Sequence, residues 1–229
     1  MTKAMILAAG RGERMRPLTD TLPKSLVKVG PYSLIEWHLF ALQKIGVQEI
    51  VINLHHLGEE IIKTLGDGSR YGVKIDYSQE KELLGTGGGI KKVLPLLGKE
   101  PFLLLSGDIF TNYPLENLLT KAEAANFPLA HLIMAPNPSY HPTGDYGLDE
   151  QGYLTFSDPR FTYASFGVIN PELFPNAIDT IFPLGDLFSS AIRNQQITGE
   201  LFEGVWENIG TQEQLISCQE KYSLAKLSS

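Results

Sequence analysis

Two glycines and two arginines follow an apolar run near the start of the chain, in the segment Leu7-Ala8-Ala9-Gly10-Arg11-Gly12-Glu13-Arg14. Because Gly10 and Gly12 carry no Cβ atom, successive backbone N–H groups can point into one concavity and approach an anion closely. Arg14 adds a planar guanidinium that matches the oxygens of a phosphate group. The segment is therefore interpreted as a site for the phosphates of a nucleoside triphosphate.

Two common phosphate-binding motifs do not fit this segment. A P-loop requires G-x-x-x-x-G-K-[ST], and the segment has no such spacing. A dinucleotide-binding fingerprint would place a third glycine where Met15 stands, and an acidic residue about 20 residues later, where Ile35 lies beside Glu36. An oxidoreductase with a nicotinamide cofactor is therefore disfavoured.

An aspartate follows a second apolar run. Residues 102–106 have the pattern of a buried strand, and Gly107 and Asp108 come directly after it. Ligands of open α/β sheets bind beyond the carboxyl ends of the strands, where a carboxylate can join Mg²⁺ to phosphates. Asp108 is thus a candidate magnesium ligand, with a helix-capping aspartate as the alternative.

Apolar runs of strand length alternate with helical patterns through the first half of the chain. This alternation predicts βαβ units and a mainly parallel sheet with helices on its faces. We expect strands at residues 5–9, 49–53, 73–77, 102–106, 129–134, 153–156 and 163–169. The prediction is a Rossmann-like, three-layer α/β fold with a mixed, mainly parallel sheet, in a single domain of residues 1–229.

Helix boundaries are marked by caps and glycines. Ser33 and Glu36 form a capping box, and Gly46 is expected to end that helix. Its predicted inner stripe comprises Leu34, Trp37, His38, Ala41, Leu42 and Ile45. Further helices are expected at residues 58–65, which Gly66 ends, and at 88–97. A second capping box, Thr211 with Gln214, is expected to begin a closing helix that carries Leu215, Cys218, Tyr222 and Ala225.

The composition limits the partners. A net charge of −7 argues against nucleic acid as a ligand, because such partners require a basic face. The single cysteine, Cys218, cannot form an internal disulfide and is predicted to be a buried thiol. The start of the chain lacks the apolar stretch of a signal peptide or membrane span, which predicts a cytoplasmic protein without a membrane partner. A monomer or small homo-oligomer is expected.

The opening run through Pro17-Leu18-Thr19, completed by Pro23-Lys24, resembles the signature of the sugar-1-phosphate nucleotidyltransferases. Matching pieces recur later, at Gly66 to Gly72, Glu82 to Gly89, Ser106-Gly107-Asp108 and Trp206 to Thr211. Within that family the short length and these runs, with Gly144-Asp145-Tyr146 and Asn170 to Phe174, are most similar to the bacterial N-acetylmuramate α-1-phosphate uridylyltransferases. The resemblance implies transfer of UMP from UTP to N-acetylmuramic acid 1-phosphate with Mg²⁺, in recycling of cell-wall sugars.

The resemblance also assigns roles to residues. Arg14 would hold the β and γ phosphates, Lys24 would reach the α-phosphate, and Asp108 completes the catalytic group; a solvated loop lysine is the alternative for Lys24. The expected nucleotide contacts are Leu7, Ala8, Ala9, Gly10, Arg11, Gly12, Glu13, Lys24, Glu82, Gly85, Thr86, Gly87 and Gly88. The expected sugar contacts are Asn53, Gly107, Asp145 and Ser165, with the Asn170 region as a further candidate. Residues 1–127 would then form mainly the nucleotide-binding half, and 128–229 the sugar-binding half and closing helix.

Asn208 departs from the family pattern, which has a second metal-binding aspartate at this position. The resemblance makes Asp108 and Asn208 the magnesium ligands, and the neutral amide predicts weaker metal binding and slower turnover. Three explanations stay open: a natural variant, an engineered trap for the substrate complex, or a nucleotide-binding protein without catalysis. Mannose, heptose or glucose 1-phosphate, with GTP or dTTP, are the alternative substrates within the family.

Overall fold

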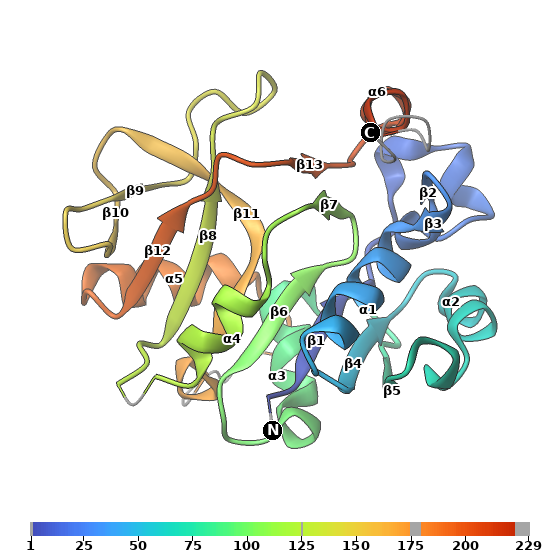
Figure 1. Ribbon diagram of the computed structural model, residues 1–229, viewed down its shortest axis with the longest axis horizontal. Coiled ribbons are helices and arrows are strands. Elements are labelled where there is room, and N and C mark those ends of the chain that lie inside the picture. The colour runs from blue at the N-terminus through green and yellow to red at the C-terminus, as the bar shows by residue number, and fades with distance from the viewer. Residues whose placement is uncertain (1, 125, 175–179, 223–229) are drawn as a thin grey trace.

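The computed structural model describes residues 2–124, 126–174 and 180–222, and a single large sheet runs through them (Figure 1). Four parallel strands lie side by side in the order β6 (Phe102–Ser106), β1 (Ala4–Leu7), β4 (Glu49–Leu54) and β5 (Lys74–Gln79). The sheet continues through strands of mixed direction, β11 (Arg160–Ile169), β8 (Ala130–Ala135) and β12 (Ile197–Leu201). The predicted mixed, mainly parallel α/β sheet is confirmed.

The remaining strands are short. Two of them extend the start of β11, namely β9 (Tyr146–Leu148) and β10 (Leu154–Thr155). Two small antiparallel pairs lie outside the large sheet, β2 (Lys28–Val29) with β3 (Tyr32–Ser33), and β7 (Ile109–Thr111) with β13 (Trp206–Asn208). Every strand expected from the sequence is present, β6 with the expected bounds and the others with shifted ones, and the largest shift is the earlier start of β11.

Helices cover both faces of the sheet. One face carries α1 (Leu34–Lys44), α2 (Gly58–Leu65) and α4 (Glu116–Ala122), and the other carries α3 (Gly85–Leu97) and α5 (Leu184–Arg193). The last described helix, α6 (Gln212–Lys221), packs beside β2. Single turns of 3₁₀ helix lie at Glu13–Met15, Leu18–Asp20, Lys24–Leu26, Ser69–Tyr71 and Pro171–Leu173. No helix in the described part of the chain is both long and apolar enough to cross a membrane.

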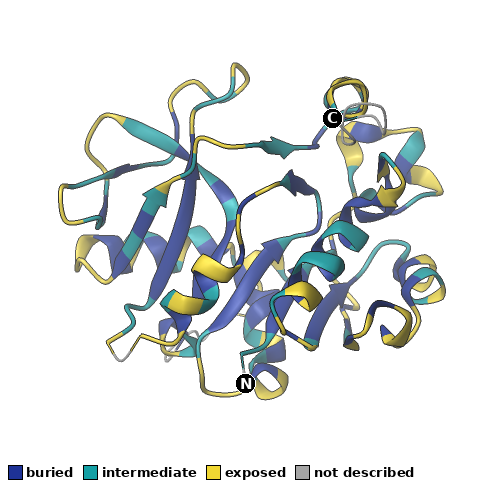
Figure 2. Ribbon diagram, in the orientation of Figure 1, coloured by how far each residue is buried: buried dark blue, intermediate teal, exposed yellow. Residues whose placement is uncertain are grey.

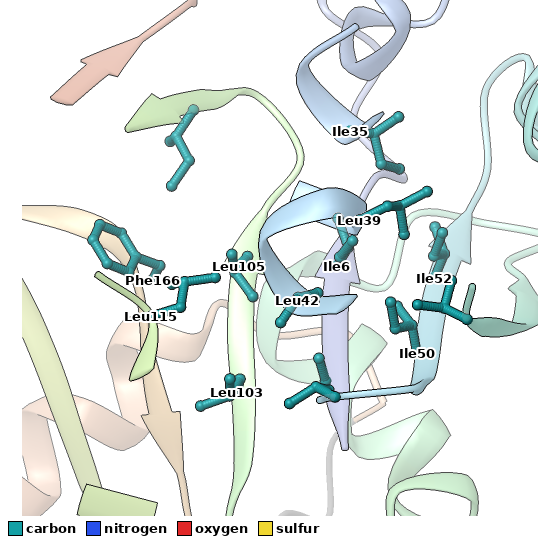
Figure 3. Packing of buried hydrophobic residues seen from close by; sticks show 14 of the residues in the cluster. Ile6, Ile35, Leu39, Leu42, Ile50, Ile52, Leu103, Leu105, Leu115 and Phe166 are labelled. Atoms are coloured by element: carbon teal, nitrogen blue, oxygen red, sulfur yellow. The ribbon is translucent and has the colours of Figure 1, made fainter. Parts of the chain in front are cut away.

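The core consists of two layers separated by the sheet. The central strands are buried (Figure 2). Alternate strand residues face opposite layers, so that Ile6 packs with α1 (Figure 3), while its neighbour Met5 belongs to the cluster that contains residues of α3 and α5. A strand that is buried on both faces must be apolar at every position, not at alternate ones. This explains why the central strands are continuous apolar runs in the sequence.

A third, smaller core cluster joins the two ends of the chain. Met15 and Leu34 pack there with Ile209, Leu215 and Cys218. Cys218 is fully buried, as predicted, and desolvation raises the pKa of its thiol to about 12. The thiol is therefore protonated at neutral pH and contributes to packing.

Two helix predictions need correction. In α1, Ile35 and Leu39 are buried, whereas Trp37 and Ala41 are only partly so. The predicted stripe was wrong there because Trp37 lies at the rim, where its Nε1 donates a hydrogen bond to the Val29 carbonyl at 2.9 Å. Helix α3 begins at Gly85, three residues earlier than expected, because its first amides find acceptors outside the helix. The predictions for α2 and for the Ser33–Glu36 capping box are confirmed, and Ala225 lies outside the described residues.

Glu36 does more than cap its helix. Its Oε2 accepts hydrogen bonds from the backbone N–H and the hydroxyl of Ser33, at 2.9 and 2.7 Å. Its Oε1 accepts from the Tyr71 hydroxyl at 2.8 Å and lies 3.5 Å from Arg70. Burial alone would raise the pKa of Glu36, but these hydrogen bonds and the Arg70 charge outweigh it and lower the pKa below its ordinary value of 4.5.

The variant Glu36→Gln is expected to lose about 1 kcal/mol of unfolding free energy at pH 7, the usual value of a cap. Because the folded-state pKa is lowered, the stabilisation is complete above the ordinary value and disappears as the pH falls through the folded value. Urea unfolding of both proteins at pH 7 and pH 3 should therefore show a difference that shrinks in acid. Glu59→Gln, an exposed first-turn glutamate of α2, is the matched control. A difference that is the same at both pH values would contradict this role of the carboxylate.

Candidate active site

Polar contacts tie together the carboxyl ends of the four parallel strands. The backbone N–H of Ala8 donates to Asn53 Oδ1 at 2.9 Å, and Asn53 Nδ2 donates to Glu80 Oε1 at 2.7 Å. The backbone N–H of Gly107 donates to the Leu7 carbonyl at 2.9 Å. The segments that leave β1, β4, β5 and β6 therefore form one connected edge.

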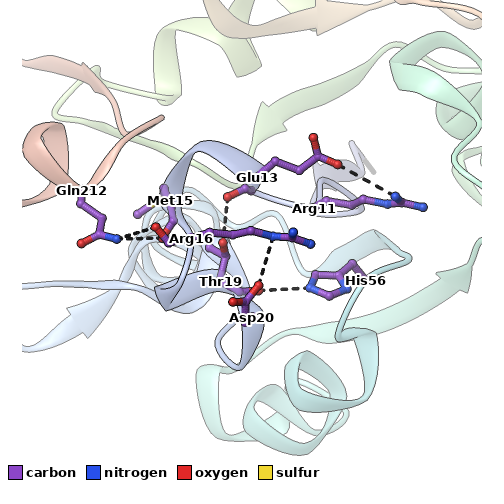
Figure 4. Close-up of polar contacts among 9 residues, drawn as sticks. Arg11, Glu13, Met15, Arg16, Thr19, Asp20, His56 and Gln212 are labelled. Carbon is purple, nitrogen blue, oxygen red and sulfur yellow. Dashed lines mark hydrogen bonds and ion pairs between the residues drawn. The ribbon is translucent and has the colours of Figure 1, made fainter.

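The glycine-containing loop after β1 is held from two directions (Figure 4). Gly12 has a φ of 64°, and its carbonyl accepts a hydrogen bond from the Thr19 hydroxyl at 2.8 Å. From the other end of the chain, Gln212 Nε2 donates to the carbonyls of Met15 and Arg16 at 3.1 and 2.9 Å. The loop is thus fixed in place by the protein alone.

A first hollow of about 260 Å³ opens at this edge. Its lining comprises Leu7, Ala8, Ala9, Gly10, Lys24, Ser25, Asn53, Glu80, Leu83, Gly85, Thr86, Ser106, Gly107 and Asp108. Most of the expected nucleotide contacts are therefore brought together. Asn53 and Gly107, which we expected on the sugar side, lie in this hollow instead because they stand at the ends of the parallel strands.

Arg11, Gly12 and Glu13, which we expected to contact the nucleotide, do not line this hollow. The left-handed turn at Gly12 packs against Thr19, and the chain then turns away from the sheet edge. Arg11 and Glu13 are exposed and lie 3.9 Å from one another (Figure 4). Of the charged residues in this loop, only Arg14 lines a hollow, namely a second hollow that adjoins the first.

The acidic residue beside the expected base-binding loop is Glu80, and the expectation that it would be Glu82 is wrong. Glu82 is exposed and does not line the hollow, whereas Glu80 lines it and is only 2% exposed. Glu80 Oε2 also accepts from the backbone N–H of Leu84 at 3.2 Å, next to the start of α3. Sequence reasoning missed Glu80, although its position directly after strand β5 was a signal.

Gly87 and Gly88 also lie outside the lining. Both are buried, and their backbone N–H groups donate to the Phe182 carbonyl at 3.0 and 3.2 Å. A Cβ atom at Gly87 would meet the Phe182 ring, and one at Gly88 the Thr180 carbonyl. These glycines therefore serve the close approach of residues 180–182 to α3, while Gly85 and Thr86 face the hollow.

Lys24 and Asp108 form an ion pair at 2.5 Å in the first hollow. Burial opposes ionisation of Asp108, but the charge of Lys24 and hydrogen bonds from Lys24 and Ser106 outweigh it and lower the pKa of Asp108. His38 lies behind this turn, and burial lowers its pKa to about 4. Asp108 is thus a carboxylate at neutral pH, and its cationic neighbour is Lys24, since His38 is uncharged.

A second hollow of about 530 Å³ adjoins the first, and Leu7, Thr86 and Ser106 line both. Its further lining comprises Arg14, Leu104, Tyr140, His141, Asp145, Tyr146, Thr162, Tyr163, Ser165, Leu184, Gly185, Phe188, Asn208 and Gln214. Two of the expected sugar contacts, Asp145 and Ser165, are therefore on its wall. A Cβ atom at Gly210 would lie 2.7 Å from Arg14 Nη2, so this glycine makes room for the guanidinium.

Asn170 lies at the opposite edge of the sheet. Strand β11 runs antiparallel to β6, with Ile169 opposite Phe102, so its carboxyl end lies beside the start of β6. Asn170 Oδ1 accepts from the backbone N–H of Glu172 at 3.0 Å and caps a 3₁₀ turn. The expectation that the Asn170 region contributes to the sugar site is therefore wrong.

The residues expected to hold Mg²⁺ are adjacent. Asn208 stands opposite Ile109 in the β7–β13 pair, and Ile209 donates its N–H to the Asp108 carbonyl at 3.0 Å. Asn208 Oδ1 is buried without a hydrogen-bond partner in the protein. Such an oxygen is free to bind a cation. Among the described residues, no group of three or more His, Cys, Asp or Glu side chains could hold a metal. One carboxylate and one amide oxygen suit Mg²⁺, which keeps waters and takes phosphate oxygens as further ligands.

Comparisons with known proteins agree with this architecture. Residues 3–158 match the family described as nucleotidyl transferase. The chain is 41% identical to the N-acetylmuramate α-1-phosphate uridylyltransferase of Neisseria meningitidis, over 91% of this chain and 93% of that protein. It is 30% identical to the protein of the same name from Caulobacter vibrioides, over 90% and 91% of the two chains.

Solved structures show the same fold. A putative glucose-1-phosphate thymidylyltransferase from Bacillus anthracis, 16% identical, superposes with a TM-score of 0.85 over 96% of this chain and 94% of the other. HddC from Yersinia pseudotuberculosis, 18% identical, gives a TM-score of 0.78 over 97% and 100%. The family match and the two related proteins together identify the chain: it is a nucleotidyltransferase and belongs to the nucleotidyl transferase family.

Proposed function

We propose that this enzyme transfers the uridylyl group of UTP to N-acetylmuramic acid 1-phosphate, giving the UDP-sugar and pyrophosphate, as a step in the reuse of cell-wall sugars. The observation that carries the proposal is the pair of adjoining hollows with the Lys24–Asp108 ion pair beside their shared wall. Ser106 lines both hollows, and its hydroxyl donates to Asp108 Oδ1 at 2.7 Å. Two substrates can therefore meet next to these charges.

The reaction joins two anions. An oxygen of the sugar phosphate attacks the α-phosphorus of UTP, and the bond from that phosphorus to the bridging oxygen breaks, so that pyrophosphate leaves with the electron pair. Lys24 lines the first hollow and would neutralise charge that builds on the α-phosphate, and the open space beside Gly10 would admit the phosphate chain. Arg14 lies in the second hollow and can bind phosphate oxygens there.

Asp108 and Asn208 are the residues that would hold Mg²⁺. The ion, when bound, supplies positive charge that offsets the negative charge of the phosphates. Without substrate, Lys24 pairs with Asp108 Oδ2 and the Ser106 hydroxyl donates to Oδ1, so cation binding at Asp108 would release Lys24 toward the phosphates.

The first hollow supports a base with a ring N–H. Glu80 lines its wall, and each of its oxygens accepts one hydrogen bond from the protein, from Asn53 and from Leu84, with a further lone pair that can accept from a ring N–H. Uracil offers N3–H to such an acceptor, whereas cytosine and adenine have no N–H at the corresponding ring position. Thymine and guanine do have one, so the choice of uracil rests on the two related uridylyltransferases.

The second hollow supports a bulky sugar acid. It is about twice the size of the first, at 530 against 260 Å³. Its charged lining residues are Arg14 and Asp145, and Asp145 Oδ1 lies 3.1 Å from His141 Nε2. Asn208 is neutral where the family pattern has an aspartate, so this wall carries one negative charge fewer. The lower negative charge favours an anionic ligand.

A substrate panel tests the assignment. Pyrophosphate release with Mg²⁺ should be measured for UTP, dTTP, GTP and CTP against the 1-phosphates of N-acetylmuramic acid, N-acetylglucosamine, glucose and mannose. We expect kcat/KM to be highest for UTP with N-acetylmuramic acid 1-phosphate. A higher value with a sugar that lacks the carboxylate would overturn the sugar assignment, and a higher value with another nucleotide would overturn the base assignment.

The variant Lys24→Met is expected to lower kcat at least about 100-fold, because it removes the charge nearest to the reacting phosphate. Lys28→Met, an exposed lysine on the neighbouring strand β2, is the matched control and should retain activity. Circular dichroism would establish that both variants are folded. Full activity in a folded Lys24→Met protein would sink this role of the ammonium group.

The variant Asn208→Asp is expected to lower the Mg²⁺ concentration for half-maximal activity several-fold and to raise kcat. A second carboxylate beside Asp108 adds negative charge, which binds the cation more tightly than an amide oxygen does. Pyrophosphate release should be titrated with MgCl₂ for both proteins. Identical titration curves would show that the charge at position 208 does not limit this enzyme.

A further inference from the structure

Strand β11 is distorted where it passes the second hollow. Tyr163 pairs with Met134 and Gly167 with Leu132 on β8, so three residues of β11 lie opposite the single residue Ile133. Within this bulge Ser165 has a φ of 63°, a left-handed conformation that L side chains rarely adopt. Such strain persists only where the surrounding structure imposes it, and it is common at ligand-binding sites.

The surrounding structure holds the bulge on both sides of Ser165. Asp145 Oδ2 accepts a hydrogen bond from the backbone N–H of Tyr163 at 2.8 Å. Trp206 Nε1 donates to the Ala164 carbonyl at 2.9 Å, so the indole fixes the residue directly before Ser165. The flanking residues Ala164 and Phe166 are fully buried, which leaves the bulge no room to relax.

The distortion brings Ser165 to the wall of the second hollow. Among the described residues its hydroxyl has no hydrogen-bond partner, so it is available to a ligand. Asp145, the carboxylate on this wall, has both oxygens engaged, one with Tyr163 and the other with His141 Nε2 at 3.1 Å. The serine hydroxyl is therefore free for a ligand, whereas both oxygens of Asp145 already hold protein groups, one of them the backbone of the bulge.

We infer that Ser165 is a specificity-determining residue whose hydroxyl binds the sugar, and that Asp145 is a positioning residue that acts through the bulge. This inference rests on the proposed function, because it takes the second hollow as the sugar site. The left-handed backbone of Ser165 is then a stability cost that the fold accepts in order to present one hydroxyl group at a fixed place.

Two substitutions separate the hydroxyl from the backbone. Ser165→Ala removes the hydroxyl and keeps the strain, so the KM for the sugar phosphate should rise about tenfold, the equivalent of one hydrogen bond, with no rise in melting temperature. Ser165→Gly removes both, so the same rise in KM should accompany a melting temperature higher by about 2–4 °C. The KM for the nucleotide should be unchanged in both variants.

Gln195→Gly is the matched control for the backbone effect. Gln195 is exposed, has a φ of 52° in the turn between α5 and β12, and does not line either hollow. The melting temperature of this variant should rise by a similar amount, and every kinetic constant should be unchanged. If Ser165→Gly lowered the melting temperature while Gln195→Gly raised it, the account of strain at Ser165 would be overturned.

Asp145 is tested with a conservative and a non-conservative change. Asp145→Asn retains an oxygen that can accept from Tyr163 N–H and should keep the sugar KM within about twofold of the wild-type value, whereas Asp145→Leu cannot and should raise it about tenfold. The nucleotide KM and the kcat at saturating sugar should be unchanged in both. A direct contact of Asp145 with the sugar predicts instead that Asp145→Asn is as impaired as Asp145→Leu.

All variants are assayed with the sugar 1-phosphate that the wild-type enzyme uses best. If that sugar is not N-acetylmuramic acid 1-phosphate, the proposed substrate fails while the inference on Ser165 is still decided. An unchanged sugar KM in Ser165→Ala overturns the inference and leaves the proposed substrate standing.

Discussion

A buried amide sets the geometry of the first hollow. Asn53 is 3% exposed and uses both ends of its side chain, since its oxygen accepts from Ala8 and its nitrogen donates to Glu80. Glu80 passes the connection on to Leu84 at the start of α3. A buried polar group that lost its partner would cost about 1–3 kcal/mol, so each member of this chain fixes the next. The loop after β1 and the start of α3 are thus connected through two side chains of the protein itself.

Much of this arrangement could be predicted from the sequence because it follows from local patterns. Continuous apolar runs predicted the buried parallel strands, and their carboxyl ends predicted that residues near Gly10 and Asp108 would meet. Helix α2 and the cap of α1 follow from residues only a few positions apart. The fold and the central charges of the site are therefore encoded in short segments.

The misplaced residues depended on long-range contacts or on strand direction. Gly87 and Gly88 pack against residues 180–182, which no local pattern connects with α3. Asn170 was assigned to the site because the antiparallel direction of β11 cannot be deduced from its apolar run. Glu82 and Glu80 differ by two positions after the end of β5, where the chain leaves the sheet and strand periodicity no longer indicates which side chain faces inward.

The contact between the two ends of the chain has a consequence for synthesis on the ribosome. Gln212, at the start of the last described helix, supports the loop that follows the first strand, and Ile209 and Leu215 complete the small core beneath that loop. Domains fold as their chains emerge, N-terminal parts first. The loop after β1 is made about 200 residues before Gln212, yet it gains this support only after Gln212 has left the ribosome. A growing chain therefore carries Arg14, Lys24 and Asp108 before the loop beside them is fully supported.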